Sequence, residues 1–243
     1  MKLFSDYEYA TIGMIHDKNL IVALEKLRDK NEIEVIIETG TNLGLGSTAL
    51  LASIFKNDDL QIHTVEVNKN IFDEAKLNLV KFKNVTCHNG CSTSLQEAIS
   101  FIENDDAIIN HQNYSEFFID DIVNPIEFYS NEIKGLLDLN ASKKSNNLLR
   151  FFNKKSLNEN LLQNLIKKFL NKKLLIVLDS AGGTGKLEFD ITKKILINES
   201  FYVLLDDTHH LKHFRSLKEI KENPKWSILD ESISHGWVIA KYN

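Results

Sequence analysis

Short apolar runs alternate with amphipathic segments along the first half of the chain. Residues 16–30 carry apolar side chains at helical spacing, and residues 33–40 form a β-branched run that ends in a turn. The same pattern continues with predicted helices over 46–55, 70–82 and 95–104, and with predicted strands over 60–68 and 84–90. The helix over 46–55 is expected to be capped by Ser47 or Thr48. Strands that alternate with helices predict a parallel α/β sheet.

The alternation pauses over residues 105–173, where helices and polar turns are expected but no strand. It resumes with strands over 173–180 and 201–207, helices over 187–198 and 210–223, and two final strands, 226–231 and 236–242, which are close enough to form a hairpin. The chain is therefore predicted to be one α/β domain, 1–243. We expect a doubly wound, Rossmann-like, seven-stranded, mostly parallel sheet with a C-terminal antiparallel hairpin and a helical insertion or cap over 105–173.

Composition places the chain among ordinary globular proteins. It has 243 residues, of which 43% are hydrophobic and 26% charged, and its net charge of −5 gives it no general attraction to nucleic acid. Two cysteines are too few for a disulfide framework. The N-terminal residues lack the apolar run of a signal peptide, and no apolar stretch is long enough for a membrane span. A cytoplasmic location is the expectation, and assembly into a homo-oligomer stays open.

The turn after the first predicted strand reads Glu38-Thr-Gly-Thr-Asn-Leu-Gly-Leu-Gly-Ser47. Glycines allow a ligand to approach the backbone closely, and the N-terminus of the following helix adds donors. The glycine spacing differs from the dinucleotide fingerprint. Glu66 ends the second strand, where a carboxylate can accept hydrogen bonds from ribose hydroxyls. The alternative is that Glu66 caps the next helix.

This constellation resembles the class I S-adenosylmethionine-dependent methyltransferases, whose first motif is acid-x-Gly-x-x-x-Gly-x-Gly. The resemblance implies a Glu66 that holds the ribose, and an adenine contact in "HNGCS" with Cys91 in place of the family's acid. The cofactor contacts that the resemblance implies are Glu38, Gly40, Thr41, Asn42, Gly44, Ser47, Glu66, Gly90, Ser92 and Asp179.

Three acids follow two of the later strands. Asp179 ends the fourth strand, and Asp206 and Asp207 end the fifth. Carboxyl ends of parallel strands meet at one edge, so these side chains are expected to converge and to suit a hard divalent ion such as Mg²⁺. The pattern is similar to the metal-dependent O-methyltransferases of the catechol and antibiotic-sugar types, in which the ion binds the substrate hydroxyl. The alternative is that the acids cap helices or contact only the cofactor.

The general base is not defined by the resemblance. Catechol-type enzymes place a lysine where this chain has Gly182, and some sugar-type enzymes place an aspartate where it has Ala181. Candidates for the catalytic base are therefore Lys186, His209, His210 and His213. For the histidines, the alternative is a cap or a solvent-facing position at the start of a helix.

A glycine-rich loop before Lys186 raises a different hypothesis, a P-loop NTPase. That motif needs a glycine where the chain has Ser180 and a hydroxyl where it has Leu187, so it fails at two defining positions. Residues 182–185 are then expected to form a rim of the pocket.

The expected function is an S-adenosylmethionine-dependent O-methyltransferase, assisted by Mg²⁺, that acts on a hydroxyl of a small molecule or sugar unit. Residues 141–173 hold nine Lys or Arg and one Glu, a charge that is usual for a solvated helix face but that could also receive an anionic substrate such as a nucleotide-sugar or phosphorylated glycan. The alternatives are a metal-independent methyltransferase of the same fold, the NTPase, and a non-catalytic cofactor-binding module.

Overall fold

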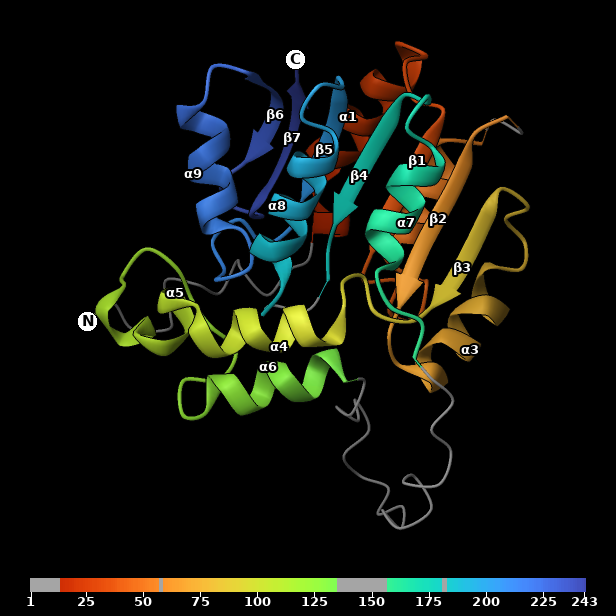
Figure 1. The fold of residues 1–243 in the computed structure, drawn as a ribbon. Coiled ribbons are helices and arrows are strands. Elements are labelled where there is room, and N and C mark those ends of the chain that lie inside the picture. The colour runs from red at the N-terminus through yellow and green to blue at the C-terminus, as the bar shows by residue number, and fades with distance from the viewer. Residues whose placement is uncertain (1–13, 57–58, 135–156, 181–182) are drawn as a thin grey trace.

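A seven-stranded sheet forms the centre of the molecule (Figure 1), in the order β3-β2-β1-β4-β5-β7-β6. The computed structural model of the protein describes residues 14–56, 59–134, 157–180 and 183–243. The strands are β1 Val35–Thr39, β2 Gln61–Glu66, β3 Val85–Asn89, β4 Leu174–Leu178, β5 Phe201–Leu205, β6 Trp226–Ser232 and β7 Trp237–Tyr242. Strands β1 to β5 are parallel, and β7 pairs antiparallel with β5 and with β6. The predicted fold class is confirmed, hairpin included.

Helices cover both faces of this sheet. Helices α1 (Lys18–Asp29) and α2 (Ser47–Ile54) pack on one face, after the short 3₁₀ turn η2 (Met14–His16). Helices α7 (Leu161–Lys168), α8 (Gly185–Ile195) and α9 (Phe214–Glu222) pack on the other, and α3 (Lys69–Leu79) lies beside β3. Strands β1, β4 and β5 are buried along their whole length, as expected for parallel strands between two helical layers.

A third group of helices lies across the carboxyl ends of the parallel strands, at the bottom of Figure 1. It contains α4 (Leu95–Asn104), α5 (Asp106–Ile109), the 3₁₀ turn η3 (His111–Asn113) and α6 (Pro125–Ile133). These elements share their own apolar cluster, which includes Ile102, Ile108 and Tyr129. We call this group the cap, because it covers the edge of the sheet where ligands bind in α/β proteins.

Residues 105–173, predicted to be a helical insertion or cap, contain helices in two different places. Helix α7 lies inside that range but packs against the sheet through Leu162, Leu165 and Ile166. Helix α4 lies outside the range but belongs to the cap. The physical reason is that a parallel connection returns across one face of the sheet, and α7 immediately precedes β4 and supplies the helix for that return. Residues 135–156 lie outside the described residues.

Two further predictions about helix starts are wrong. Gly46 is the residue before α2, while the hydroxyls of Ser47 and Thr48 bond to Asp179 and Glu38 instead of capping the helix. Helix α9 begins at Phe214 and not at residue 210. In both places the local polar groups are bound by residues distant in sequence, and the pattern of apolar positions carries no information about those partners.

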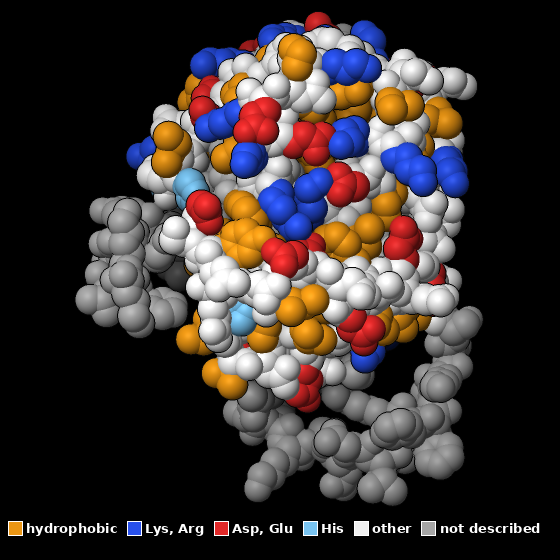
Figure 2. All heavy atoms as spheres, turned by 60° about the vertical axis from the view of Figure 1, so that its left-hand side comes forward, with side chains coloured by type: hydrophobic (Ala, Val, Ile, Leu, Met, Phe, Trp, Pro, Cys, Tyr) orange, Lys and Arg blue, Asp and Glu red, His pale blue; other side chains and the backbone are white. Residues whose placement is uncertain are grey.

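Within the described ranges, no helix has the length and apolar character needed to cross a membrane. Figure 2 shows one face of the molecule, on which basic and acidic side chains lie next to each other. Salt bridges from Lys186 and Lys193 on α8 to Glu219 on α9 are examples of such neighbouring opposite charges.

Candidate active site

A cavity of about 840 Å³ opens at the carboxyl edge of the sheet, under the cap. Its walls come from the β1–α2 turn, the ends of β2, β4 and β5, and the cap residues Phe118, Asp120 and Glu132. Strands β1 and β4 are neighbours, and the chain leads from them toward opposite sides of the sheet. This is the topological switch point, where open α/β sheets bind their ligands.

The glycine turn forms one wall through unusual backbone angles. Gly40 has a φ of +90°, and a Cβ added there would lie 2.0 Å from the carbonyl oxygen of Asp179. Gly44 has a φ of +71°, and its Cβ would lie 2.7 Å from Leu79. Between them Asn42 also has a positive φ, 49°. The turn therefore needs glycine both for its conformation and for the close approach of β4 and α3.

Glu38 lies beneath this turn and does not reach the cavity. Its Oε2 accepts hydrogen bonds from Thr48 (2.5 Å) and Thr64 (2.7 Å), and Thr64 is also hydrogen-bonded to Thr41. Burial raises the pKa of Glu38 to about 7. Glu38, one of the cofactor contacts that the resemblance implies, therefore supports the turn from below and does not line the cavity.

Glu66 is held at the end of β2 with its carboxylate in the cavity wall. Its Oε2 accepts the N–H of Asn42 at 2.9 Å, and its Oε1 accepts the N–H of Asn68 at 2.8 Å. Burial raises its pKa. Each carboxylate oxygen can accept a further hydrogen bond, so Glu66 offers two fixed acceptors to a vicinal diol.

The loop after β3 is clamped by the segment that precedes α7. Gly90 has a φ of +153°, and an added Cβ would lie 2.2 Å from the carbonyl oxygen of Asn158, which accepts the N–H of Cys91 at 2.8 Å. The Cys91 thiol is buried and neutral, because burial raises its pKa to about 12. Ser92 lines the cavity, but its hydroxyl donates to Glu188.

Glu188 was missed by sequence reasoning, although it is an acid on the otherwise apolar inner side of a predicted helix. It is fully buried on α8 and lines the cavity. It accepts hydrogen bonds from Thr39 (2.8 Å), Ser180 (2.7 Å) and Ser92. Glu188 thus ties the ends of β1 and β4 and the β3 loop to one helix.

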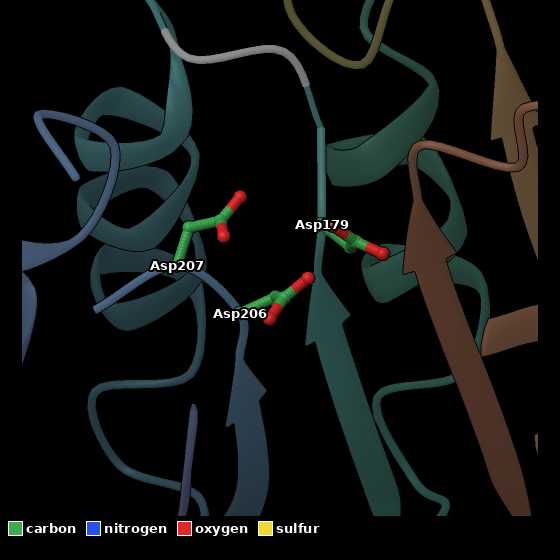
Figure 3. Close-up of side chains that lie close together, drawn as sticks. All are labelled: Asp179, Asp206 and Asp207. Carbon is green, nitrogen blue, oxygen red and sulfur yellow. The ribbon is translucent and has the colours of Figure 1, made fainter. Parts of the chain in front are cut away.

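The three acids expected to converge do so. Figure 3 shows the side chains of Asp179, Asp206 and Asp207 close together beyond the ends of two neighbouring strands, and one carboxylate oxygen from each lies within 4.8 Å of the others. Asp206 is 6% exposed, and its Oδ1 has no hydrogen-bond partner in the described structure. Burial and the neighbouring Asp179 raise the pKa of Asp206. Asp207 has a left-handed backbone with a φ of 54°.

Lys212 lies among these acids, and sequence reasoning did not find it. Its ammonium is 2.9 Å from Asp207 Oδ2 and 3.2 Å from Asp179 Oδ1, and its side chain is 4% exposed. The sequence pattern placed Lys212 inside a helix starting at residue 210, where no particular direction for its side chain could be predicted. In the structure it belongs to the loop between β5 and α9.

The acid cluster does not fit Mg²⁺ while Lys212 keeps this position. Magnesium needs oxygen ligands at about 2.0–2.1 Å, and here the ammonium already bridges oxygens of Asp179 and Asp207. Two unit charges about 4 Å apart interact by about 4 kcal/mol at an effective dielectric constant of about 20, and a divalent ion doubles this repulsion. We therefore assign no reaction step to a metal.

Three of the four candidate bases point away from the cavity. Lys186 pairs with Asp190 on its own helix at 2.5 Å, and His209 is hydrogen-bonded to the carbonyl of Ile233. His213 is buried, with its Nε2 3.1 Å from the carbonyl oxygen of Leu178. Burial lowers the pKa of His213 well below its usual value. Neither Lys186 nor these two histidines line the cavity.

His210 does line the cavity. Its Nδ1 accepts the backbone N–H of Lys212 at 3.0 Å, so this nitrogen offers no lone pair to a substrate proton. Because Nδ1 accepts that bond, Nε2 carries the ring proton. Nε2 is 3.1 Å from Asp120 Oδ2, but it is buried and has no partner with hydrogen-bond geometry in the described structure.

Two cap carboxyl groups face this end of the cavity and differ in ionisation. Asp120 has its pKa lowered by His210, although burial opposes the shift. Glu132 has its pKa raised to about 8 by burial and by the charge of Asp120. The Oε2 of Glu132 is buried and has no hydrogen-bond partner in the described structure. Neighbouring carboxyl groups with separated pKa values are typical of acid–base sites.

No protein-family model and no curated protein matches the chain. Solved structures do align with it. An O-methyltransferase from Bacillus cereus in complex with S-adenosylhomocysteine aligns over 99% of this chain and 88% of its own, with 14% identity and a TM-score of 0.48. The O-methyltransferase TomG from Streptomyces achromogenes, involved in tomaymycin synthesis and solved with S-adenosylmethionine, aligns over 98% and 84%, with 11% identity and a TM-score of 0.46.

Likenesses of this degree carry no argument about activity. The strand order of the chain itself, with its C-terminal antiparallel pair, is that of a doubly wound, Rossmann-like sheet.

Proposed function

We propose that this protein is an S-adenosylmethionine-dependent O-methyltransferase. The observation that carries the proposal is the charge of a cavity built at the switch point of the sheet. Among the described residues that line it are seven carboxyl side chains and one lysine: Glu66, Asp120, Glu132, Asp179, Glu188, Asp206, Asp207 and Lys212. S-adenosylmethionine carries a positive sulfonium, a positive amino group and one carboxylate, and acidic walls attract its net positive charge. A phosphate-bearing cofactor would be repelled.

The proposed binding mode follows the order of the strands. Glu66 would accept the two ribose hydroxyls, with the adenine over the loop of Gly90 and Ser92. The methionine end would lie along Gly40, Thr41 and Asn42, with its amino group toward Asp179. Gly44 and Ser47 shape the turn and the start of α2 that close this end.

When bound, S-adenosylmethionine would supply the methyl group. The new O–C bond to the acceptor hydroxyl would form as the S–C bond breaks, with S-adenosylhomocysteine as the leaving group, and the hydroxyl proton would pass to a base. Positioning of the two reactants supplies most of the rate in such a transfer. We assign the base to Glu132, because its carboxyl lines the cavity and its Oε2 is buried without a partner.

Glu132→Gln is expected to change the pH dependence of turnover. Glu132 has its pKa raised to about 8, so the ionised base is scarce at lower pH. The wild-type rate should rise about tenfold per pH unit up to about pH 8 and then level. The variant should lose this rise and turn over about 10²- to 10⁴-fold more slowly at pH 8. Initial rates from pH 6 to 9 measure both effects.

Glu127→Gln is the matched control, because Glu127 is an exposed acid on the same helix. Its pH profile should equal that of the wild type. A Glu132→Gln profile with the wild-type inflection would contradict the assignment of the base.

The walls also indicate the kind of acceptor. We propose a neutral or cationic hydroxylated small molecule, such as an amino-bearing sugar or alcohol, in place of the anionic substrate suggested by composition. Of the basic residues in 141–173, Lys167, Lys168, Lys172 and Lys173 are described, and all are exposed. Lys172 pairs with Glu34 just before β1, at the amino ends of the strands and opposite the cavity.

The experiment that tests the proposed function is calorimetric titration with S-adenosylhomocysteine, followed by transfer of a labelled methyl group from S-adenosylmethionine to a panel of acceptors. Micromolar binding and labelled product are the expected results. Binding without transfer to any acceptor from the native pathway would favour the non-catalytic module. An absence of binding would overturn the proposal.

Lys186, the residue on which the NTPase alternative depends, does not line the cavity. A P-loop lysine must reach phosphate oxygens, whereas Lys186 is paired with Asp190 and Glu219 on the side of α8 that faces α9. ATP should accordingly give no heat of binding under conditions in which S-adenosylhomocysteine does.

A further inference from the structure

We infer that Lys212 is the resident cation of the Asp179–Asp206–Asp207 cluster and that this protein binds no divalent ion there. Only the role given below to the Lys212 ammonium in methyl transfer rests on the proposed function. The main test of the inference, metal binding, is independent of methyl transfer.

The Lys212 side chain is built into the site. Its backbone N–H is fixed by His210 Nδ1 at 3.0 Å, and its stem passes the start of α8. A Cβ at Gly185 would lie 2.3 Å from Lys212 Cγ and 2.8 Å from the Lys212 carbonyl oxygen. The first residue of α8 must therefore be glycine for the lysine to enter the cavity wall.

The contacts of the ammonium match those that a metal ion would make. It bridges Asp179 Oδ1 and Asp207 Oδ2, which come from the ends of different strands. The ammonium is buried, with a side chain that is 4% exposed, and both of these contacts are with carboxylate oxygens. An ion entering the same oxygens would face this fixed positive charge at short range.

The cluster holds one cation and three acidic side chains without a metal. Lys212 contacts Asp179 and Asp207, and the Asp206 carboxyl lies beside them, with one oxygen of each acid within 4.8 Å of the others. The cation of the cluster is thus supplied by the chain itself.

This arrangement gives Lys212 a task in the proposed reaction. An ammonium has three N–H donors, and two are directed at Asp179 and Asp207. The third can donate to the oxygen of an acceptor hydroxyl, since Lys212 lines the cavity. Such a hydrogen bond stabilises the negative charge that develops on oxygen as its proton leaves.

The test is a titration with Mn²⁺, followed by electron paramagnetic resonance of the free ion, on the full chain with and without S-adenosylhomocysteine. Wild type is expected to bind no Mn²⁺ at concentrations up to about 1 mM. Lys212→Met keeps the length of the side chain, removes the charge, and should bind Mn²⁺ at least about tenfold more tightly. Asp206→Asn in the Lys212→Met background should abolish that gain.

Lys186→Met is the matched control, because this lysine also pairs with acids but lies outside the cavity. It should leave Mn²⁺ binding unchanged. One equivalent of Mn²⁺ bound by wild type, and lost in Asp206→Asn, would overturn the inference. The wild-type titration decides the question even if Lys212→Met fails to fold.

Turnover after removal of metals separates this inference from the proposed function. EDTA is expected to leave the wild-type rate of methyl transfer unchanged, and loss of the rate with recovery on added Mg²⁺ would contradict the inference. If S-adenosylhomocysteine does not bind at all, the proposed function fails, while the Mn²⁺ titration still decides whether Lys212 excludes the ion.

Discussion

Glu66→Ala is expected to weaken the binding of S-adenosylhomocysteine about 100-fold. The carboxylate is fixed at the end of β2 by the N–H groups of Asn42 and Asn68, so it meets a ribose without reorganisation. Hydrogen bonds to a charged group contribute about 1.5–3 kcal/mol each. Losing two should cost about 3 kcal/mol, and every 1.4 kcal/mol is about tenfold in affinity. Isothermal titration calorimetry measures the change directly.

Two control variants distinguish the loss of a contact with the ligand from a loosening of the β1–α2 turn. Glu66→Gln keeps the shape and one acceptor oxygen, so its affinity should fall between those of wild type and Glu66→Ala. Glu74→Ala removes an exposed acid from the neighbouring helix α3 and should bind like wild type. Equal affinities for wild type and Glu66→Ala would show that Glu66 is only a helix cap.

Gly40→Ala adds one methyl group and is expected to lower the free energy of unfolding strongly. The residue has a φ of +90°, and its added Cβ would lie 2.0 Å from the carbonyl oxygen of Asp179. A left-handed non-glycine residue costs about 1–3 kcal/mol. Overpacking costs about 1–3 kcal/mol more. We expect the free energy of unfolding to fall by about 2–6 kcal/mol, and cofactor binding to be lost as β1 and β4 separate. Urea unfolding followed by circular dichroism measures the first effect.

Gly46→Ala is the matched control in the same turn. Its φ of −95° and ψ of −121° are disfavoured for a residue with a Cβ, but among the described residues the only atom within 4 Å of an added Cβ is the tip of Ile15 at 3.9 Å. This variant therefore adds backbone strain of about 1–3 kcal/mol without a clash, and it should lose less stability than Gly40→Ala. If Gly40→Ala unfolds at the same urea concentration as Gly46→Ala, the close approach of β1 and β4 is not a requirement of the fold.

The acidic residues at the carboxyl ends of the parallel strands could be predicted together from the sequence. Glu66, Asp179, Asp206 and Asp207 each come directly after an apolar run, and parallel strands bring their carboxyl ends to one edge. Register along each strand then fixes which residue reaches the edge, so the convergence of the three aspartates needed no knowledge of side-chain packing.

The candidate bases were not predictable in the same way. His209, His210 and His213 are close in sequence, but the structure directs them to Ile233, Asp120 and Leu178 respectively. A loop between a strand and a helix has no fixed period, so sequence spacing does not say where each side chain points. The direction is set by partners on other elements.

The sequence by itself determined the alternation of strands and helices, the sheet with its final hairpin, the strained glycine turn at Gly40 and the acidic edge. These follow from apolar periodicity and from the backbone conformations that only glycine adopts readily. The tertiary structure decided that α4 joins the cap, that Glu38 lies beneath the turn, and that Lys212 lies among the acids. Those outcomes depend on contacts between segments far apart in the chain, such as Gly185 beside Lys212, because burial and charge pairing act between neighbours in space.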